Sequence, residues 1–293
     1  MIIKHTSGNI LIIGFGKLGS HLFHELKHTR KYHNIRAVKE RRLAAGKYIK
    51  LVGSSDIIFL CVQDSKISSA VKRLQQADVN LKNKFIFHTS GALTSDELSE
   101  LAAKGAITGS FHPVQSFAGK VTRKAGSFKG IYIAAEGSPK ALKKMKDLAR
   151  ALQAIPFEIK KQNKIYHHIC CVMSSNFLAV LNGKIADTGL KRIQINGFKN
   201  RTFFNIYMPL ALQTLKNVAD SGPVSALTGP IERNDIATVQ AHLNALKKSN
   251  KGLLSYYILM GIETVKLALK KKSIRKTDAE NIYKLFSKFI IKQ

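Results

Sequence analysis

The sequence has few cysteines and no long apolar run. Its three cysteines are Cys61, Cys170 and Cys171; two are adjacent and none forms a CxxC pair, which argues against a disulfide framework or a zinc-binding pair. The apolar runs 10–13 and 57–62 are too short to cross a bilayer, and the N-terminal region lacks the apolar stretch and cleavage site of a secretory signal. We therefore expect a cytoplasmic protein in a reducing environment, without membrane association.

Acidic residues are also scarce: 18 Asp and Glu against 48 Lys and Arg give a formal net charge of +30. Such an excess would fit nucleic-acid binding, because Lys and Arg contact phosphates. The cations are spread along the chain without a nucleic-acid-binding signature, so we favour many solvated lysines and no specific nucleic-acid partner. A basic surface would still attract small anions, such as a phosphorylated cofactor or a carboxylate substrate.

The length of 293 residues suggests two domains, and the residue pattern changes near residue 160. Before this point short apolar runs alternate with amphipathic stretches, which is typical of a doubly wound α/β sheet. We predict a Rossmann-type, mostly parallel sheet domain over residues 1–160. Its strands are expected at 9–13, 34–38, 56–62, 84–88, 107–111, 130–134 and 157–159, and its helices at 18–27, 67–74, 95–103 and 139–153.

After residue 160 the apolar residues recur at helical spacing and strand-like runs disappear. We predict an all-helical domain over residues 161–293 for substrate binding and dimerisation. Pro209 is expected to kink one of its helices. The helices are expected at 164–189, 201–221, 235–248, 252–271 and 277–291.

The segment GFGKLG at residues 14–19 follows a predicted strand and precedes a predicted helix. In this context Gly14 would allow a tight turn, Gly16 a close approach to a pyrophosphate, and Gly19 close packing of helix on strand. The N–H groups at the helix start would bind the phosphates. The alternative is a glycine-rich turn that only packs. The predicted cofactor-binding residues of the turn are Gly14, Phe15, Gly16, Lys17, Leu18 and Gly19.

The end of the second predicted strand distinguishes the two nicotinamide cofactors. NAD binding favours an acidic residue about 20 positions after the turn. Here Lys39, Arg41 and Arg42 surround the single carboxylate of Glu40. Because cations suit a 2′-phosphate, we favour NADP(H), with the alternative that Glu40 alone faces the ribose.

Polar residues follow three predicted strands at the sheet edge where ligands bind in such folds. Cys61, Val62 and Gln63 are expected beside the cofactor. The segments HTSGA at 88–92 and HPVQSF at 112–117 are expected to bind a substrate carboxylate or carbonyl, unless they serve only local turn chemistry. His88 and His112 lack a third ligand at a suitable spacing, so no metal site is expected.

The helical part contains further polar candidates. His168 opens a helix that continues to Asn176, about 12 Å further along the axis, so the two could contact different parts of one substrate–cofactor pair. Structural alternatives are helix capping and interhelical hydrogen bonding. Asp235, three residues before Thr238, is typical of a helix N-cap. Arg233 in the preceding loop could bind a carboxylate through two hydrogen bonds.

Four motifs together resemble a known family: HTSGAL at 88–93, GSFHPVQSF at 109–117, HHICCVMSSNF at 167–177 and ALTGPIERND at 226–235. The sequence is similar to a family of Rossmann-like reductases whose C-terminal domain was long catalogued as of unknown function. Within that family it particularly resembles the branch of alternative ketopantoate reductases. The resemblance implies NADPH-dependent reduction between two domains, and a homodimer formed through the helical domains. The functional positions it implies are Ser90, His112, Gln115, His168, Asn176 and Arg233.

The sequence departs from the family pattern in places. Asn234 stands where the family usually has Gly, which a left-handed backbone would tolerate. Ile169, Cys170 and Cys171 replace small residues after the helix-opening histidine. The Lys and Glu acid–base pair of the better-known ketopantoate reductases has no clear counterpart in this sequence.

The leading hypothesis is an enzyme that reduces 2-dehydropantoate to pantoate for pantothenate and coenzyme A synthesis. His168 or His112 would donate the proton, and Asn176 would polarise the carbonyl. The alternatives are another 2-keto acid or a cyclic imine such as pyrroline-5-carboxylate as substrate, and a non-catalytic NADP(H)-binding sensor. The residues predicted to bind the anionic substrate are Ser90, Gly91, Gln115, Ser116 and Arg233.

Overall fold

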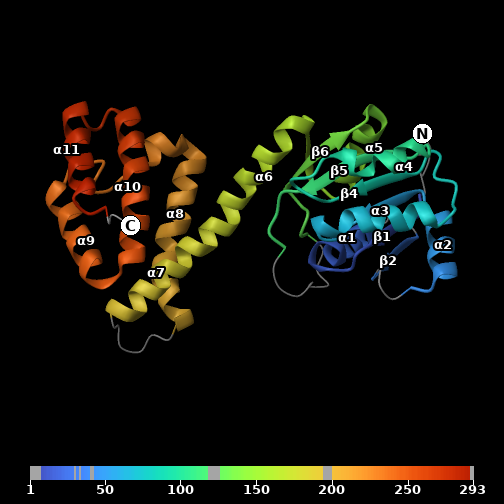
Figure 1. Cartoon of the computed structure of the whole chain (residues 1–293), viewed down its shortest axis with the longest axis horizontal. Helices are drawn as coiled ribbons and strands as arrows, with labels where there is room; N and C mark the ends of the chain where they lie inside the picture. Colours follow the sequence, from blue (N-terminus) through green and yellow to red (C-terminus); the bar gives the residue numbers. More distant parts are fainter. Residues whose placement is uncertain are drawn as a thin grey trace. The chain divides into compact units, whose positions relative to one another are not determined.

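The computed structural model describes residues 8–29, 31–32, 34–39, 43–117, 126–193 and 200–290, without the side chains of 189–192 and 200–204. Two compact units divide at Leu178 and Ala179 (Figure 1). The division falls after the predicted boundary at residue 160. The helix α6 (Lys164–Val172) belongs to the first unit, because its first residue, Lys164, is buried there against the sheet.

The first unit contains a seven-stranded sheet with the order β2-β1-β3-β4-β5-β6-β7. The neighbours from β2 to β5 are parallel, whereas β6 runs antiparallel to β5. The predicted doubly wound, mostly parallel sheet is therefore confirmed. The strands are β1 (Ile10–Ile13), β2 (Ile35–Val38), β3 (Ile57–Leu60), β4 (Phe85–His88), β5 (Ile107–Pro113), β6 (Tyr132–Gly137) and β7 (Ile155–Glu158).

Helices cover both faces of this sheet, because the side chains of a strand alternate between them. In β1, Ile10 and Ile12 join one apolar cluster and Leu11 and Ile13 join the other. The first cluster includes residues of α1 (Lys17–His28) and α5 (Pro139–Ala151). The second includes residues of α2 (Ala45–Gly53), α3 (Ile67–Gln76) and α4 (Ser99–Ala103).

The helix α2 is the element that the sequence analysis missed. It has nine residues, Gly46 in its first turn, and an N-cap, Ala44, without a capping side chain. Its start therefore carries none of the usual signals. Packing of Tyr48, Leu51 and Val52 into the core stabilises it instead.

The second unit is helical, as predicted. Its apolar core contains Val239, Leu254 and Ile282 among others. The non-helical backbone within α8 lies at Gly222, before Pro223, rather than at Pro209 where we expected a kink; a residue before proline is driven out of the helical region. The helices are α7 (Leu178–Arg192), α8 (Asn200–Ala226), α9 (Ile236–Ser249), α10 (Lys251–Lys271) and α11 (Lys276–Ser287).

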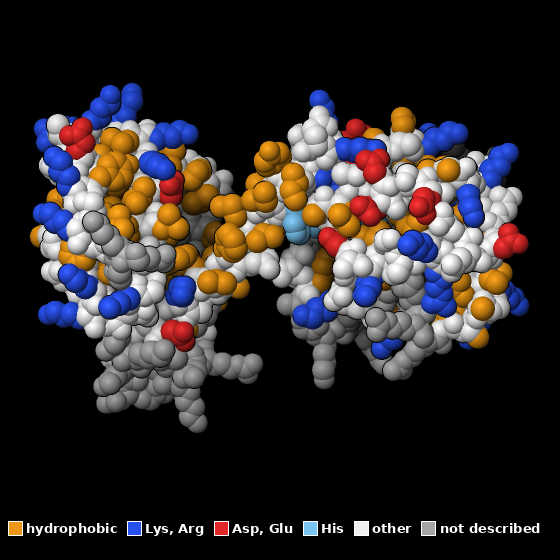
Figure 2. Space-filling model, in the orientation of Figure 1, with side chains coloured by type: hydrophobic (Ala, Val, Ile, Leu, Met, Phe, Trp, Pro, Cys, Tyr) orange, Lys and Arg blue, Asp and Glu red, His pale blue; other side chains and the backbone are white. Residues whose placement is uncertain are grey.

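Cationic side chains are scattered over the visible face of each unit, while apolar side chains gather over parts of the helical unit (Figure 2). On α8, Leu210, Leu212 and Leu215 are 68%, 58% and 50% exposed. Two helical stretches, 161–188 and 251–271, are also long and apolar enough to cross a membrane when judged by length and composition alone.

Candidate functional site

The glycine turn after β1 packs tightly against the end of β3. A Cβ on Gly14 would overlap the carbonyl group of Cys61, and a Cβ on Gly19 would overlap the carbonyl oxygen of Gly14. Gly14 also has a φ of +102°, which L side chains rarely adopt. These two glycines are therefore required by the turn itself.

Gly16 is different, because a Cβ there would meet no described atom within 4 Å. Gly16 is the N-cap of α1, and the first turn of this helix contains no acidic residue. The helix start therefore keeps its positive dipole end, which favours an anion. A pyrophosphate lying against the backbone would use the space of a Cβ, so the turn fits a dinucleotide. Phe15 packs edge-on against Phe23, with the ring centroids 5.6 Å apart.

Lys39 lies beside this turn. It follows β2 directly and is exposed, and the N–H of Gly14 donates to the carbonyl oxygen of Val38 at 2.9 Å. Arg41 and Arg42 lie outside the described residues. The structural support for a 2′-phosphate site is therefore the cation of Lys39.

The residues after β3 border the turn through their backbone. Cys61 N–H donates to the carbonyl oxygen of Ile13 at 2.8 Å. Burial raises the pKa of the Cys61 thiol to about 12, so this thiol is protonated and a poor nucleophile. The side chain of Val62 lies next to Gly14, and Gln63 is exposed. This arrangement suits residues that shape a cofactor site without reacting.

The loop after β4 is held by its own polar side chains. His88 Nε2 lies 2.9 Å from the carbonyl oxygen of Thr94, and His88 Nδ1 accepts from the N–H of Ser90 at 3.2 Å. Burial lowers the pKa of His88 to about 4, so the ring is neutral. His88 therefore shapes the loop.

Ser90 has a similar structural role. Its hydroxyl donates to Asp64 Oδ2 at 2.8 Å and accepts from the N–H groups of Ala92 and Leu93 at 3.2 and 3.0 Å. These bonds match the local turn chemistry that we considered as the alternative. Substrate binding by Ser90 stays a prediction.

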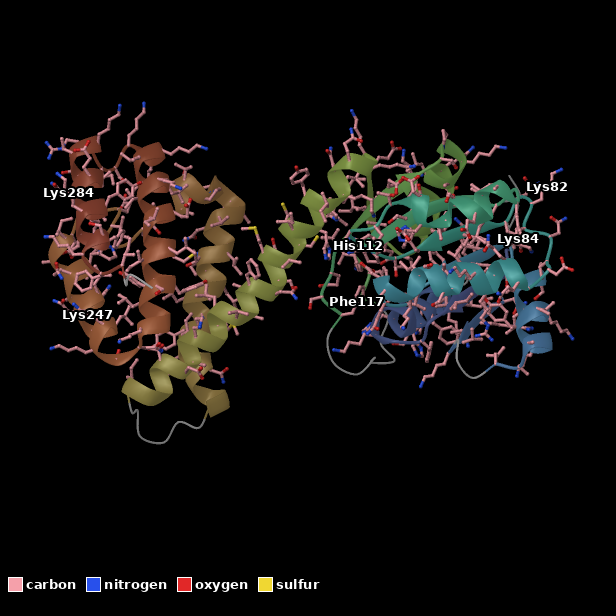
Figure 3. The ribbon with its side chains drawn as sticks, viewed as in Figure 1. Lys82, Lys84, His112, Phe117, Lys247 and Lys284 are labelled. Atoms are coloured by element: carbon pink, nitrogen blue, oxygen red, sulfur yellow. The ribbon has the colours of Figure 1, made fainter. Side chains whose placement is uncertain are left out.

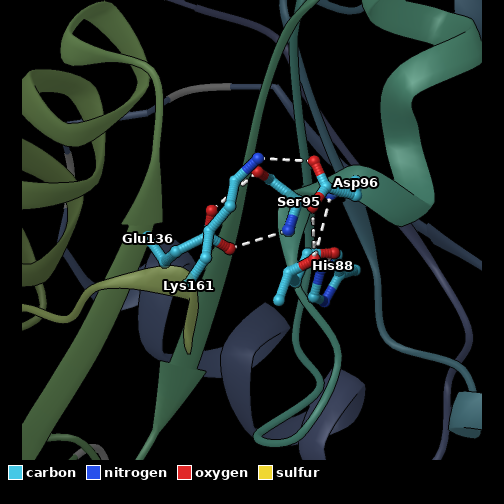
Figure 4. A network of polar contacts seen from close by, with 6 residues as sticks. His88, Ser95, Asp96, Glu136 and Lys161 are labelled. Atoms are coloured by element: carbon cyan, nitrogen blue, oxygen red, sulfur yellow. Dashed lines mark hydrogen bonds and ion pairs between the residues drawn. The ribbon is translucent and has the colours of Figure 1, made fainter. Parts of the chain in front are cut away.

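A second polar network anchors the other end of this loop (Figure 4). The buried carboxylate of Glu136 on β6 accepts from the N–H and the hydroxyl of Ser95, both at 2.7 Å. Lys161, just before α6, pairs with Asp96. The network therefore joins the loop after β4, the strand β6 and the start of α6.

Three predicted residues, Gly91, His112 and His168, come together at the end of β5. A Cβ on Gly91 would lie 2.7 Å from His168 Nδ1 and 2.8 Å from His112 Nε2. The ring centroids of His112 and His168 are 6.4 Å apart. His168 Nδ1 is buried and has no hydrogen-bond partner among the described residues. Gly91 is thus required for the backbone to approach both imidazoles.

His112 is neutral at physiological pH. Burial, together with nearby His167 and Lys164, lowers the pKa of His112 to about 3. This differs from our expectation of a histidine that titrates near neutrality, because a buried imidazolium beside other cations is costly. His112 is therefore poorly suited to carry an additional proton, whereas it can still donate or accept a hydrogen bond.

Lys164, the first residue of α6, is a site residue that was not predicted from the sequence. Its side chain is fully buried, and Nζ donates to Ser110 Oγ at 2.6 Å and to the carbonyl oxygen of Ser90 at 3.1 Å. Burial lowers the pKa of Lys164 to about 8, although Glu136 and Asp64 oppose this shift. A sequence signal existed, because Lys164 is three and four positions before His167 and His168 and hence on their side of a helix.

The remaining predicted site residues are not part of this cluster. Gln115 and Ser116 are exposed, and Gln115 Oε1 accepts from the N–H of Ser116 at 2.9 Å. Asn176 is exposed in a π-helical turn over Met173–Phe177, an irregularity that is frequent at functional sites. Arg233 is exposed in the second unit.

The loop around Arg233 confirms two structural expectations. Asn234 has a φ of +55°, the left-handed conformation that explains how it replaces a glycine. Asp235 is the N-cap of α9 and accepts from the N–H of Thr238 at 3.0 Å.

A glycine turn at the carboxyl ends of parallel strands, backed by helices on both sheet faces, defines the first unit as a Rossmann-type domain. Family comparisons agree: residues 2–113 match the Rossmann-like domain, and residues 131–264 match the Domain of unknown function (DUF2520). The chain thus combines a Rossmann-like domain with a C-terminal domain of that family, as the resemblance implied. No curated protein matches the chain.

Solved structures share this fold over nearly the whole chain. A Bacteroides fragilis protein provisionally named an NADP oxidoreductase has a TM-score of 0.70 and 18% identity, covering 90% of this chain and 100% of that one. Thermotoga maritima TM1727 has a TM-score of 0.67 and 21% identity, with 90% and 99% covered. Plasmodium falciparum pyrroline carboxylate reductase, solved with NADP bound, has a TM-score of 0.59 and 16% identity, with 93% and 98% covered.

Proposed function

We propose that the protein is an NADPH-dependent reductase of small anionic carbonyl or imine compounds. The observation that carries this proposal is the combination within one unit of an open Gly16 turn and a cluster of the buried Lys164 with the half-buried His112 and His168. The turn follows β1 and His112 lies at the end of β5 in the parallel part of the same sheet, at the edge where such folds bind ligands. The similar structures with NADP in their names support the same class.

The bound cofactor would supply a hydride to the carbon of the C=O or C=N bond. The backbone around Gly16 and the start of α1 would hold the pyrophosphate, and Lys39 would pair with the 2′-phosphate. The backbone of Cys61 and Val62 would lie beside the turn, on the side that faces the nicotinamide ring of the bound cofactor. Each of these roles uses the geometry of the first unit alone.

His168 is our choice for the residue that gives the proton to the product. Its Nδ1 is buried against Gly91 and has no hydrogen-bond partner in the part of the chain that the structure describes, so an oxygen or nitrogen of a substrate could complete its hydrogen bonding. Lys164 remains mostly protonated at neutral pH, because its pKa is about 8. Its fixed charge beneath the loop of Ser90 would favour an anionic substrate and the negative charge that develops on a carbonyl oxygen.

We propose 2-dehydropantoate as the first substrate to test, because the four sequence motifs resemble the alternative ketopantoate reductases. Gln115, Ser116 and Asn176 would then supply further contacts to the carbonyl and the carboxylate, and carboxylate binding by Arg233 stays a prediction from the sequence. A cyclic imine is the second candidate, which the shared fold of the Plasmodium falciparum pyrroline carboxylate reductase favours.

The test is NADPH oxidation by the purified protein with 2-dehydropantoate, pyrroline-5-carboxylate and a panel of other 2-keto acids. Turnover with one substrate class identifies it, and a Gly16→Asp variant gives the background. NADPH binding without turnover on any of them would instead support a non-catalytic sensor. Absence of NADPH binding would contradict the whole proposal.

We also propose a cytoplasmic homodimer that uses the helical unit. Leu210, Leu212 and Leu215 on α8 expose apolar surface that a second copy would cover. A membrane is a poorer partner, because Lys184 and Asp187 interrupt the first apolar stretch and Glu263 and Lys266 interrupt the second. Charged side chains are costly inside a bilayer.

A further inference from the structure

One cluster in the first unit shares only His112 with the site of the reductase proposal, and its other two members have no part in that proposal. His112 at the end of β5 meets two residues of α6, His167 and Cys171, which lie one helical turn apart (His112 is labelled in Figure 3). Each offers one metal-ligating atom, and these three atoms lie within 4.8 Å of one another. No metal site was expected from the sequence, where His88 and His112 have no third ligand at a suitable spacing, but the fold brings His167 and Cys171 to His112.

Two of the three distances within the cluster match those of a metal centre. His112 Nδ1 lies 3.2 Å from His167 Nε2, and His167 Nε2 lies 3.7 Å from Cys171 Sγ. Zinc binds nitrogen at about 2.0–2.1 Å and sulfur at about 2.3 Å, so tetrahedral ligands are separated by about 3.3 Å for N···N and about 3.6 Å for N···S. Two of the ligand-to-ligand distances therefore already have the length expected around a tetrahedral zinc ion.

We propose that His112, His167 and Cys171 form a binding site for a thiophilic divalent transition-metal ion, with Zn²⁺ as the representative. Two imidazoles and a thiolate suit zinc and similar ions rather than Mg²⁺ or Ca²⁺. Three protein ligands leave a fourth position open for water or a ligand. The ion would tie β5 to α6, and the site does not depend on the proposed reductase activity.

The cysteine is the decisive ligand. Lys164 lies one turn before His167 on α6, and its positive charge helps to lower the pKa of both His112 and His167. The same charge opposes the binding of a cation by these histidines. A thiolate on Cys171 offsets one positive charge of the ion, which a neutral ligand cannot do. The adjacent Cys170 is exposed and outside the cluster, so it provides a matched control with the same chemistry.

The experiment uses untagged, full-length protein that has been stripped with a chelator, without cofactor or substrate. It is titrated with Co²⁺, and the Co²⁺ is then displaced by Zn²⁺. We expect one equivalent of Co²⁺ with the absorption of a tetrahedral ion and a thiolate-to-cobalt charge-transfer band. Saturating Zn²⁺ should raise the Tm by at least about 2 °C.

The variants separate the proposed ligands from their neighbours. Cys171→Ser should abolish the charge-transfer band and weaken binding at least tenfold, His167→Ala should weaken it similarly, and Cys170→Ser should bind like the wild type. If Cys171→Ser fails to fold, Cys171→Ala replaces it, with circular dichroism as the check. An octahedral spectrum without the thiolate band, or equal binding by the two serine variants, would overturn the proposal. Since the assay contains no NADPH, its failure is separate from a failure of reductase activity.

Discussion

Lys164 Nζ donates a hydrogen bond to Ser110 Oγ at 2.6 Å, although the lysine side chain has no exposed surface. Among the described residues no carboxylate forms an ion pair with it; Glu136 and Asp64 act only through their charge. A buried ammonium without a direct counter-ion costs stability. The fold therefore maintains a positive charge beneath the loop that carries Ser90.

This charge predicts a specific pH dependence of stability. The folded pKa of Lys164 is about 8 instead of 10.5, so between these values the unfolded chain binds a proton that the folded chain has released, and stability rises with pH. The full effect is about 3 kcal/mol, of which about 2 kcal/mol falls between about pH 7.5 and 9.5.

Urea unfolding at both pH values should show this gain for the wild type relative to Lys164→Met. Lys160→Met, at an exposed site, should keep the gain. Equal pH dependence of wild type and Lys164→Met would refute the buried charge.

The turn at Gly16 predicts a loss of binding without a loss of folding. Gly16 has φ −83° and ψ −159°, which alanine can adopt, and its Cβ would meet no described atom. Gly16→Ala should therefore change the free energy of unfolding by less than about 1 kcal/mol and weaken NADPH binding tenfold or more, because a methyl group would occupy the space of the pyrophosphate. Gly46→Ala, also without a neighbour within 4 Å, is the control and should bind normally. Fluorescence titration with NADPH gives both affinities, and unchanged affinity of Gly16→Ala would contradict the proposed cofactor site.

His168 predicts an effect on turnover alone. His168→Ala should lower kcat by about 10²–10⁴ if it provides the proton. The NADPH affinity should be unchanged, because the contacts of His168 are with Gly91 and His112 rather than with the glycine turn. His242→Ala, an exposed histidine of the second unit, should retain wild-type kinetics. Steady-state assays on the substrate identified first would decide, and wild-type kcat in His168→Ala would assign proton donation elsewhere.

Asn234 predicts a backbone effect in the second unit. Its φ of +55° disfavours residues with a Cβ other than Asn and Asp, and its side chain also hydrogen-bonds to Asp278. Asn234→Gly and Asn234→Ala both lose that bond, so their difference isolates the backbone. The alanine variant should be less stable than the glycine variant by about 1 kcal/mol. Urea denaturation measures this difference, and equal stabilities would argue against a left-handed residue in solution.

The exposed leucines of α8 predict the oligomeric state. Leu210→Glu should convert the proposed homodimer to a monomer, because a carboxylate would be buried in an apolar interface. Gln76→Glu adds the same charge at an exposed position of the first unit and should remain dimeric. Sedimentation velocity distinguishes the two states. A wild-type protein that is monomeric at all concentrations would exclude the dimer.

Local signals were sufficient for most of the fold and for the cofactor turn. Short continuous apolar runs predicted β1 and its neighbours, and helical spacing predicted α7 to α11. Gly14, Gly16 and Gly19 marked the turn, since each of these patterns acts within a few residues of the chain. The same holds for Asp235 as an N-cap. The short helix α2 was missed because its stability comes from Tyr48 and Leu51 in the core rather than from its ends.

The sequence by itself determined a Rossmann-type sheet followed by a helical domain, because backbone geometry and side-chain periodicity are local. Only the tertiary structure decided the chemistry at the end of β5. Lys164, His167 and Cys171 lie more than 50 positions after His112, and only the packing of α6 against the sheet brings them together. The same burial sets the pKa of Lys164 at about 8 and that of His112 at about 3, because desolvation depends on the surrounding fold and not on the residue alone.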